Sequence, residues 1–315
     1  MDRHTVRRPR PADAAAVHEL VAAYDISVIG VPDVTLDDIA DELAELDTEH
    51  DAWLAEDTTG TPNGWAWIIA KGDSDHADVE VVVRPGTGDG VTEHLWAAVV
   101  ERSRELAAER GHEGVTLDIG VYRADEDKQA LVKGLGFEAA TSFHRLVIDF
   151  DGPVDAPRPP EGVTLHPALT DELRREAHRL HQEGFADHFG FVPVPYEEWL
   201  ARRETSAATD WTQVLVARVD GEPAALLVGT NHFAEDENRG YVLTLTTLPA
   251  FRGRGLGRFL LRTAFAADAA RGRRGTLLQV DANNTTPALG LYTSAGMTPV
   301  LAIDVWRSRI EALTA

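Results

Sequence analysis

The sequence predicts an α/β protein built of two tandem domains, and three observations support this. The 315 residues are many for one compact domain but enough for two of ordinary size. A Pro/Gly-rich segment, residues 151–162, divides the chain into halves of nearly equal length. The two halves also resemble each other. We therefore expect an N-terminal domain at residues 1–150, a linker at 151–161 and a C-terminal domain at 162–315.

The resemblance between the halves is an internal repeat. Each half begins with a short strand that is followed by an amphipathic helix. Late in each half the pattern Leu-x-x-x-x-Gly-Phe/Met occurs, which aligns Gly136 with Gly296. A strand follows in both halves, at Phe143–Phe150 and at Val300–Trp306. The order of elements is therefore the same at the start and at the end of each half.

The stretch Leu248–Arg258, with the sequence LPAFRGRGLGR, is the most informative part of the C-terminal half. It follows a strand-like run, Tyr241–Thr247, and precedes a helix-like run, Phe259–Ala270. A glycine-rich turn at a helix start gathers free backbone N–H groups, and the helix dipole adds positive potential. Glycines let the backbone approach an anion closely. Positive charge comes from Arg252, Arg254 and Arg258. The stretch is a candidate pyrophosphate site.

Two other phosphate-binding motifs fit this loop less well. A P-loop needs Lys and Ser or Thr after its last glycine, whereas Gly257 precedes Arg258 and Phe259. A dinucleotide-binding G-x-G-x-x-G motif would need glycine where Arg258 or Leu260 stands. An acidic residue at the end of the next strand, Asp281, keeps that alternative open. A plain glycine-rich surface turn would explain the glycines but not the arginines.

The residues that follow the loop distinguish these possibilities. The helix-like run is followed by a buried strand, Thr276–Asp281, then by Asn284 and a short helix, Pro287–Ala295, that carries Tyr292. In order and spacing this resembles the GCN5-related N-acetyltransferase (GNAT) superfamily. The motif of that family is a strand, Pro-x-x-Arg-Gly-x-Gly-x-Gly and a helix, then a second strand, an Asn and a helix with Leu-Tyr.

The resemblance implies a fold and a cosubstrate. Each domain would contain a mixed, mostly antiparallel central sheet with flanking helices. The strand before the motif and the strand after it would splay apart, and acetyl-CoA would enter the gap; no metal is implied. The implied cofactor-binding residues are Leu245, Thr246, Thr247, Arg252, Gly253, Arg254, Gly255, Leu256, Gly257, Arg258 and Asn284.

The resemblance also implies direct attack of an amine on the thioester, with a backbone N–H near the splay supporting the developing oxyanion. Tyr292 would be the catalytic residue, a phenol that protonates the departing thiolate. Packing in the core is the alternative role of its ring. The attacking ammonium also needs a base, which the sequence leaves open. The candidates are His181, His188, His232, Glu235 and Asp236.

The N-terminal half lacks most of these features. Val132 stands where Tyr292 stands in the C-terminal half. The loop at residues 86–90 contains glycines but no arginine, and Asp89 and Glu93 place negative charge where a pyrophosphate would lie. We therefore expect a degenerate N-terminal domain without a cofactor site.

Composition restricts the possible partners. A net charge of −22 argues against nucleic acid. The same charge either maintains solubility or draws a cationic amine into an acidic acceptor cleft. The absence of cysteine excludes disulfides, thiolate metal sites and a cysteine nucleophile, and the twelve histidines show no paired metal-binding spacing. No apolar run is long enough for a membrane and no signal peptide is evident. We expect a cytoplasmic monomer or homodimer.

The aromatic segment Gly184–Trp199 is the expected acceptor-side element, or else a helical hairpin whose rings pack on the core. It is similar to stretches in tandem acetyltransferases such as mycothiol synthase. That enzyme has a glutamate eight residues before the motif proline, where this chain has Tyr241, so the acceptor stays open. We expect an N-acetyltransferase that acts on a primary amine of a small molecule. The alternative is a non-catalytic acyl-CoA-binding or scaffold module.

Overall fold

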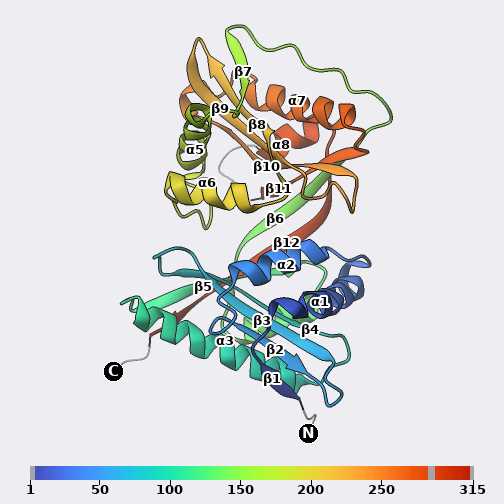
Figure 1. The fold of residues 1–315 in the computed structure, drawn as a ribbon, viewed down its shortest axis with the longest axis vertical. Coiled ribbons are helices and arrows are strands. Elements are labelled where there is room, and N and C mark those ends of the chain that lie inside the picture. Colours follow the sequence, from blue (N-terminus) through green and yellow to red (C-terminus); the bar gives the residue numbers. More distant parts are fainter. Residues whose placement is uncertain (1–3, 283–287, 313–315) are drawn as a thin grey trace. The chain divides into compact units, whose positions relative to one another are not determined.

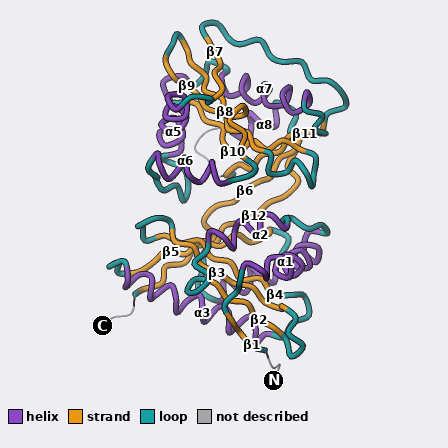
Figure 2. The backbone as a smooth tube through the Cα atoms, in the orientation of Figure 1, coloured by secondary structure: helices purple, strands orange, loops and turns teal. Residues whose placement is uncertain are grey.

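The computed structural model describes residues 4–282 and 288–312 (Figure 1). The chain forms two compact units. Unit 1 contains the residues up to Thr141 together with those from Ile303 onward, and unit 2 contains Ser142–Ala302. Both units contain helices and strands, as the tube view shows (Figure 2). The α/β class expected from the sequence is confirmed.

Unit 1 is a sheet with helices on both faces. The strand order is β1-β2-β3-β4-β5-β12, and the neighbours are antiparallel except for β4 and β5. Helix α3 packs on one face, and α1 and α2 pack on the other. The elements are β1 (Thr5–Arg7), η1 (Pro11–Asp13), α1 (Ala14–Ile29), α2 (Leu36–Glu45), β2 (Ala52–Glu56), β3 (Pro62–Ala70), β4 (His76–Val83), α3 (Asp89–Glu109), β5 (Gly114–Tyr122), α4 (Glu126–Gly134) and β12 (Thr298–Glu311).

Unit 2 repeats this plan. Its strand order is β6-β11-β10-β9-β8-β7, and the neighbours are antiparallel except for β10 and β11. Helices α5 and α6 lie on one side of the sheet and α7 on the other (Figure 1). The elements are β6 (Glu138–Asp149), β7 (Val163–Pro167), α5 (Asp171–Phe185), α6 (Tyr196–Thr205), β8 (Thr209–Val219), β9 (Glu222–Thr230), β10 (Arg239–Thr247), η2 (Pro249–Phe251), α7 (Leu256–Ala270), β11 (Gly275–Asp281) and α8 (Ala288–Ser294).

Side-chain alternation along the strands produces a core on each face of the unit 2 sheet. On β9, Ala225 and Leu227 belong to the cluster that contains α7, whereas Leu226 and Val228 belong to the cluster that contains α5 and α6. This period of two is what a strand buried on both faces requires. The sheet is therefore held between two helical layers, and β10 is fixed from both sides.

The last strand of each half of the chain belongs to the sheet of the other unit. Strand β6, from the N-terminal half of the chain, pairs with β11 from Phe143↔Asp281 to Asp149↔Gly275. Strand β12, from the C-terminal end, pairs with β5 from Ile303↔Tyr122 to Glu311↔Gly114. The units therefore do not coincide with the expected domains at residues 1–150 and 162–315. The expected linker at 151–161 lies within unit 2, because it connects β6 to β7.

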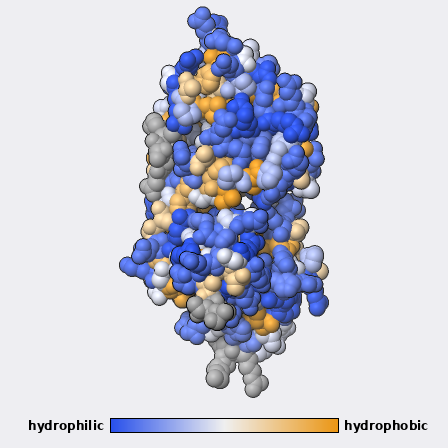
Figure 3. Space-filling model, turned by 90° about the vertical axis from the view of Figure 1, so that its left-hand side faces the viewer, coloured by the Kyte–Doolittle hydropathy of each residue, from blue (hydrophilic) through white to orange (hydrophobic). Residues whose placement is uncertain are grey.

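Hydrophilic residues cover most of the face in Figure 3, and hydrophobic residues gather there in small patches. Within the described residues, no helix is both long and apolar enough to cross a membrane.

Candidate active site

The centre of unit 2 is the point at which β10 and β11 part. Within the described residues, these parallel strands pair only from Arg239↔Gly275 to Val242↔Leu278. Strand β10 continues to Thr247 along its other neighbour β9, and β11 continues to Asp281 along β6. A register shift between Val242 and Thr244 marks an irregularity in β10 at the same place. Backbone groups of β10 beyond Val242 therefore face a gap instead of a neighbouring strand.

This gap is a cavity of about 500 Å³, which we call the slot. It is bounded by the separated ends of β10 and β11, the turn before α7, and the helices α7 and α8. The residues that line it are Phe143, Gly184, Phe185, His188, Tyr241, Val242, Leu243, Leu245, Thr246, Thr247, Phe251, Arg252, Gly253, Gly255, Leu256, Gly257, Arg258, Leu278, Gln279, Val280, Asp281, Ala288, Leu291 and Tyr292. A volume of this size is typical of a small-molecule or cofactor site.

The three glycines of the loop serve different purposes. Gly253 and Gly255 both have φ of +78°, a left-handed conformation that other residues adopt at a cost. Gly255 is the N-cap of α7, which begins at Leu256 and not at Phe259 as expected. Gly257 lies inside the first turn, where a Cβ would stand 3.1 Å from Cδ2 of Leu291. The first turn of α7 can therefore present its free N–H groups to the slot.

Two of the three motif arginines reach the slot. Arg252 and Arg258 line it, and Nε of Arg252 donates to the carbonyl oxygen of Thr247 at 3.2 Å. Arg254 is not among the lining residues, and its guanidinium carbon lies 5.6 Å from the centre of the Phe251 ring. Asn284 lies outside the described residues. The remaining cofactor-binding residues expected from the sequence all line the slot.

Tyr292 reaches the slot from α8. Only 7% of its surface is exposed, and its ring belongs to the same core cluster as Leu256 and Leu260. Burial raises the pKa of the phenol to about 12, so it carries its proton at neutral pH. The two roles weighed for this residue are thus compatible, because the ring packs in the core while the side chain also borders the slot.

Residues from the end of α5 and the turn after it also border the slot. His188, a base candidate from the sequence, follows α5, and its ring centre lies 4.3 Å from that of Phe185. Burial lowers the pKa of His188 against the opposing effect of Asp281. Gly184 packs so closely on Thr246 that a Cβ there would overlap the threonine side chain. Only the tertiary contact of α5 with β10 reveals this glycine, since the motif does not include it.

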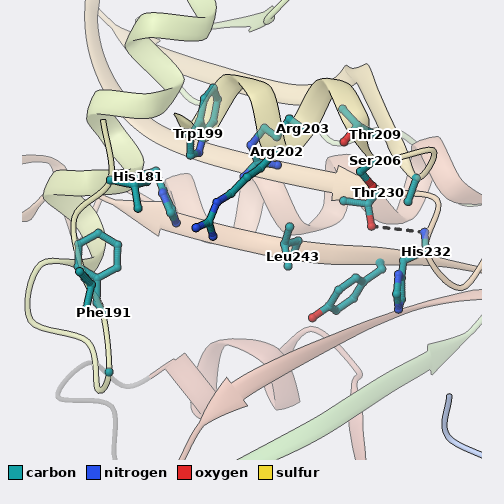
Figure 4. Close-up of a pocket in the computed structure, with 15 residues that line it drawn as sticks. His181, Phe191, Trp199, Arg202, Arg203, Ser206, Thr209, Thr230, His232 and Leu243 are labelled. Carbon is teal, nitrogen blue, oxygen red and sulfur yellow. Dashed lines mark hydrogen bonds between the residues drawn. The ribbon is translucent and has the colours of Figure 1, made fainter. Parts of the chain in front are cut away.

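A second cavity of about 520 Å³ adjoins the slot, and we call it the side pocket. Tyr241 and Leu243 of β10 line both cavities. The segment from α5 to α6 supplies much of the wall, including Phe191 and Trp199. In Figure 4, His181 and Phe191 lie at one end of this pocket and His232 at the other. The side pocket is therefore a candidate acceptor site, and the aromatic segment does border it.

The base candidates distribute unevenly between the cavities. His181 and His232 line the side pocket, and His188 lines the slot. Glu235 and Asp236 line neither cavity. Burial, with Arg203 as the next contribution, lowers the pKa of His181 to about 4. The ring centre of His232 lies 6.1 Å from that of Tyr241, one of the two residues that line both cavities.

Unit 1 contains the equivalent separation of strands, but side chains occupy it. Strands β4 and β5 pair only from His76↔Thr116 to Asp78↔Asp118. Beyond that point Nζ of Lys128 lies 2.6 Å from Glu80 and 5.0 Å from the ring centre of Tyr24. The cavity that remains there is about 220 Å³. The acidic helix start expected from the sequence is present as well, since Asp89 lies in the first turn of α3.

Parted parallel strands beside a glycine- and arginine-rich helix start define an acyltransferase of the GNAT type, and comparisons with known proteins agree. The model of the "Acetyltransferase (GNAT) family" matches residues 170–297. A mycothiol acetyltransferase of Thermobispora bispora is 32% identical over 236 residues, which cover 71% of this chain and 74% of the relative. A mycothiol acetyltransferase of Catenulispora acidiphila is 26% identical over 322 residues, 93% of this chain and 94% of the relative.

Solved structures show the same fold. A GCN5-related N-acetyltransferase from Sphaerobacter thermophilus has a TM-score of 0.84 at 24% identity and covers 100% of this chain and 98% of that one. A tandem GNAT protein from the clavulanic acid biosynthesis pathway has a TM-score of 0.75 at 16% identity, with coverage of 99% and 100%. The chain belongs to the GNAT family of acetyltransferases and has its tandem architecture.

Proposed function

We propose that this protein transfers the acetyl group of acetyl-CoA to a primary amine of a small molecule by direct attack. The observation that carries the proposal is the slot itself. It joins a helix start with Arg252 and Arg258, a strand edge beyond Val242 and a protonated phenol at Tyr292. These three features match the three parts of acetyl-CoA. The helix start suits the pyrophosphate, the strand edge suits the extended amide-bearing arm, and the phenol can protonate the leaving thiolate.

The reaction then proceeds on the backbone edge of β10. The free amine attacks the thioester carbonyl carbon, and a β10 N–H on the unpaired side supports the oxyanion. The C–S bond breaks, and the thiolate takes the phenolic proton of Tyr292, which solvent restores. The attacking nitrogen gives its extra proton to a base. We assign that role to His232, because it borders the side pocket beside Tyr241, where the two cavities meet.

The competing possibility is a module that binds acyl-CoA without catalysis. A binding module needs the helix start and the slot but has no use for a protonated phenol in the slot or for a second cavity. Calorimetry with acetyl-CoA, followed by an assay for free CoA against a library of amines, separates the two. Binding with CoA release supports the transferase, whereas tight binding with no release for any amine supports the module. Absence of acetyl-CoA binding contradicts both.

The assignment of His232 has its own test. His232→Gln keeps a polar side chain of similar size but cannot accept a proton, and we expect kcat/KM to fall by roughly 10²–10⁴-fold. The acetyl-CoA affinity should stay unchanged. His181→Gln, at the opposite end of the same pocket, is the matched control and should lose far less. Equal losses in the two variants would indicate a shared packing role.

A further inference from the structure

The side pocket contains a positive charge for which the described residues provide no counterion. Arg203 of α6 lines it, and its guanidinium carbon lies 4.5 Å from the ring centre of Trp199. Its Nε atom is buried and has no hydrogen-bond partner among the described residues, none of which forms an ion pair with it. Burial alone lowers the pKa of the guanidinium to about 10. It therefore still carries its charge at neutral pH, in an environment where charged groups are normally paired.

The neighbouring arginine does not share this condition. Arg202 is exposed and pairs with Glu198 at 2.8 Å. The described lining of the side pocket includes no aspartate or glutamate; beside polar residues, Arg202 among them, it contains apolar side chains such as Phe191, Trp199 and Leu243. This is notable in a chain with a net charge of −22. The idea of an acidic cleft that draws in a cationic amine therefore does not fit this pocket.

The position of the charge relates to the reaction. Arg203 is close enough to His181 for its charge to lower the pKa of that histidine. Figure 4 places His181 at one end of the pocket and His232 at the other, with Leu243 between them. The amine is expected at the His232 end, beside Tyr241, where the slot adjoins. A group bound at Arg203 would thus belong to the part of the acceptor that is remote from its amine.

We propose that Arg203 binds an anionic group of the acceptor, a carboxylate or a phosphate, so that the substrate is an amine that also carries a negative charge. A guanidinium offers a planar pair of N–H donors that matches two oxygens of either anion. Such an anion would supply the missing counterion inside an apolar wall, where the attraction is strong. The inference rests on the proposed function and specifies its substrate class.

The test uses the full chain and matched amines. Phenylalanine, its methyl ester and phenethylamine share an aromatic body that suits the wall of the pocket but differ in charge. Glucosamine 6-phosphate and glucosamine form the phosphate pair. We expect the anionic member of at least one set to have a kcat/KM about 10–100-fold above its neutral counterparts. Preference within the first set would identify a carboxylate, and preference within the second a phosphate.

Variants then connect this preference to Arg203. Arg203→Gln should raise KM for the preferred anionic amine about 10–100-fold, with KM for acetyl-CoA and for the neutral amine unchanged. Arg203→Lys should restore part of the loss, because it keeps the charge without the forked donors. Arg179→Gln is the control for net charge, since that exposed arginine pairs with Glu183 and lines neither cavity.

Two outcomes would overturn the inference. One is equal turnover of neutral and anionic amines together with an unaffected Arg203→Gln variant. The other concerns probes that are not acetylated. If saturation-transfer NMR in the presence of CoA shows no preference for the anionic members, the inference fails. Calorimetry with acetyl-CoA does not depend on the acceptor amine. A failure of the proposed acetyl-CoA-dependent function would therefore be recognised separately from a failure of this inference.

Discussion

At the scale of single residues, Tyr292 shows how burial prepares a group for a chemical role. Its ring packs in the core, and burial raises the pKa of the phenol to about 12. A group whose pKa is raised in this way is protonated throughout the neutral range and loses its proton only near that higher value. A phenol with an unshifted pKa near ~10 would lose it earlier.

Tyr292→Phe keeps the ring but removes that proton. We expect turnover to fall by roughly 10²–10⁴-fold with little change in acetyl-CoA affinity, since the interaction exists only in the transition state. Because the acid form is the active one, the limb of the wild-type kcat profile due to Tyr292 should descend near pH 12. Steady-state kinetics across pH measure both effects. A loss below about threefold, with an unaltered profile, would leave Tyr292 with a packing role only.

At the scale of elements, the start of α7 combines backbone geometry with charge. Gly255 has a positive φ and caps the helix, and nothing within 4 Å would obstruct a Cβ there. Substitution at this position therefore acts through backbone conformation and charge, not through crowding. Arg252 contributes side-chain charge next to the same N–H groups.

Gly255→Asp should weaken acetyl-CoA binding by several kcal/mol, because it strains a left-handed residue and places a negative charge beside the pyrophosphate. Arg252→Ala should cost less, about 1–3 kcal/mol, since the backbone donors remain. Calorimetry gives both values, and thermal melts check that each variant is folded. Normal cofactor affinity in both variants would reduce the loop to a structural turn and contradict the proposed cofactor site.

At the scale of the whole molecule, the sheet of each unit is completed by a strand from the other half of the chain. Arg307 of β12 forms a bidentate pair with the buried carboxylate of Asp118 on β5, at 2.7 and 2.8 Å. The whole length of β11 pairs with β6, from Phe143↔Asp281 to Asp149↔Gly275. Neither sheet is complete without a segment from the other half of the chain.

A fragment that starts at Pro159 lacks β6 and leaves the full edge of β11 exposed. We expect it to be insoluble or inactive, because an unpaired edge strand exposes backbone groups and core side chains. The matched fragment Glu138–Ala302 retains β6 and should be the more stable of the two. Solubility and thermal melts of both fragments measure the difference. A soluble, fully active Pro159 fragment would show that the exchange is dispensable.

The gap between β4 and β5 in unit 1, which side chains occupy, leads to a prediction of how many acetyl-CoA molecules bind per chain. Lys128 and Glu80 fill the place that acetyl-CoA would enter, and Asp89 stands at the helix start. We expect one acetyl-CoA per chain, because binding in unit 1 would have to break a partly buried ion pair. Calorimetry reports the number directly. Two comparable sites per chain would mean that the unit 1 cavity opens.

Local features of the chain predicted much of the fold and of the slot. Gly253 and Gly255 can adopt the left-handed conformation that the turn has, and a proline, arginine and glycine pattern before an apolar run indicates that a helix follows. The expected strand at Tyr241–Thr247 falls within β10. The sequence pattern predicts the start of α7 at Phe259, whereas the helix begins at Leu256. The reason is that Gly257 in the first turn weakens the local helix signal, while packing stabilises the helix.

The sequence by itself therefore determined the α/β class, the tandem repeat and the loop that borders the slot, since these are visible in local residue patterns and in the recurrence of those patterns along the chain. Only the tertiary structure decided which strand completes which sheet and that, among residues 4–282 and 288–312, Arg203 has no counterion. Strand pairing and the neutralisation of a buried charge depend on residues far apart in the chain. Local sequence patterns therefore could not predict the strands that pair with β6 and β12, nor the absence of an acidic partner of Arg203 among the described residues.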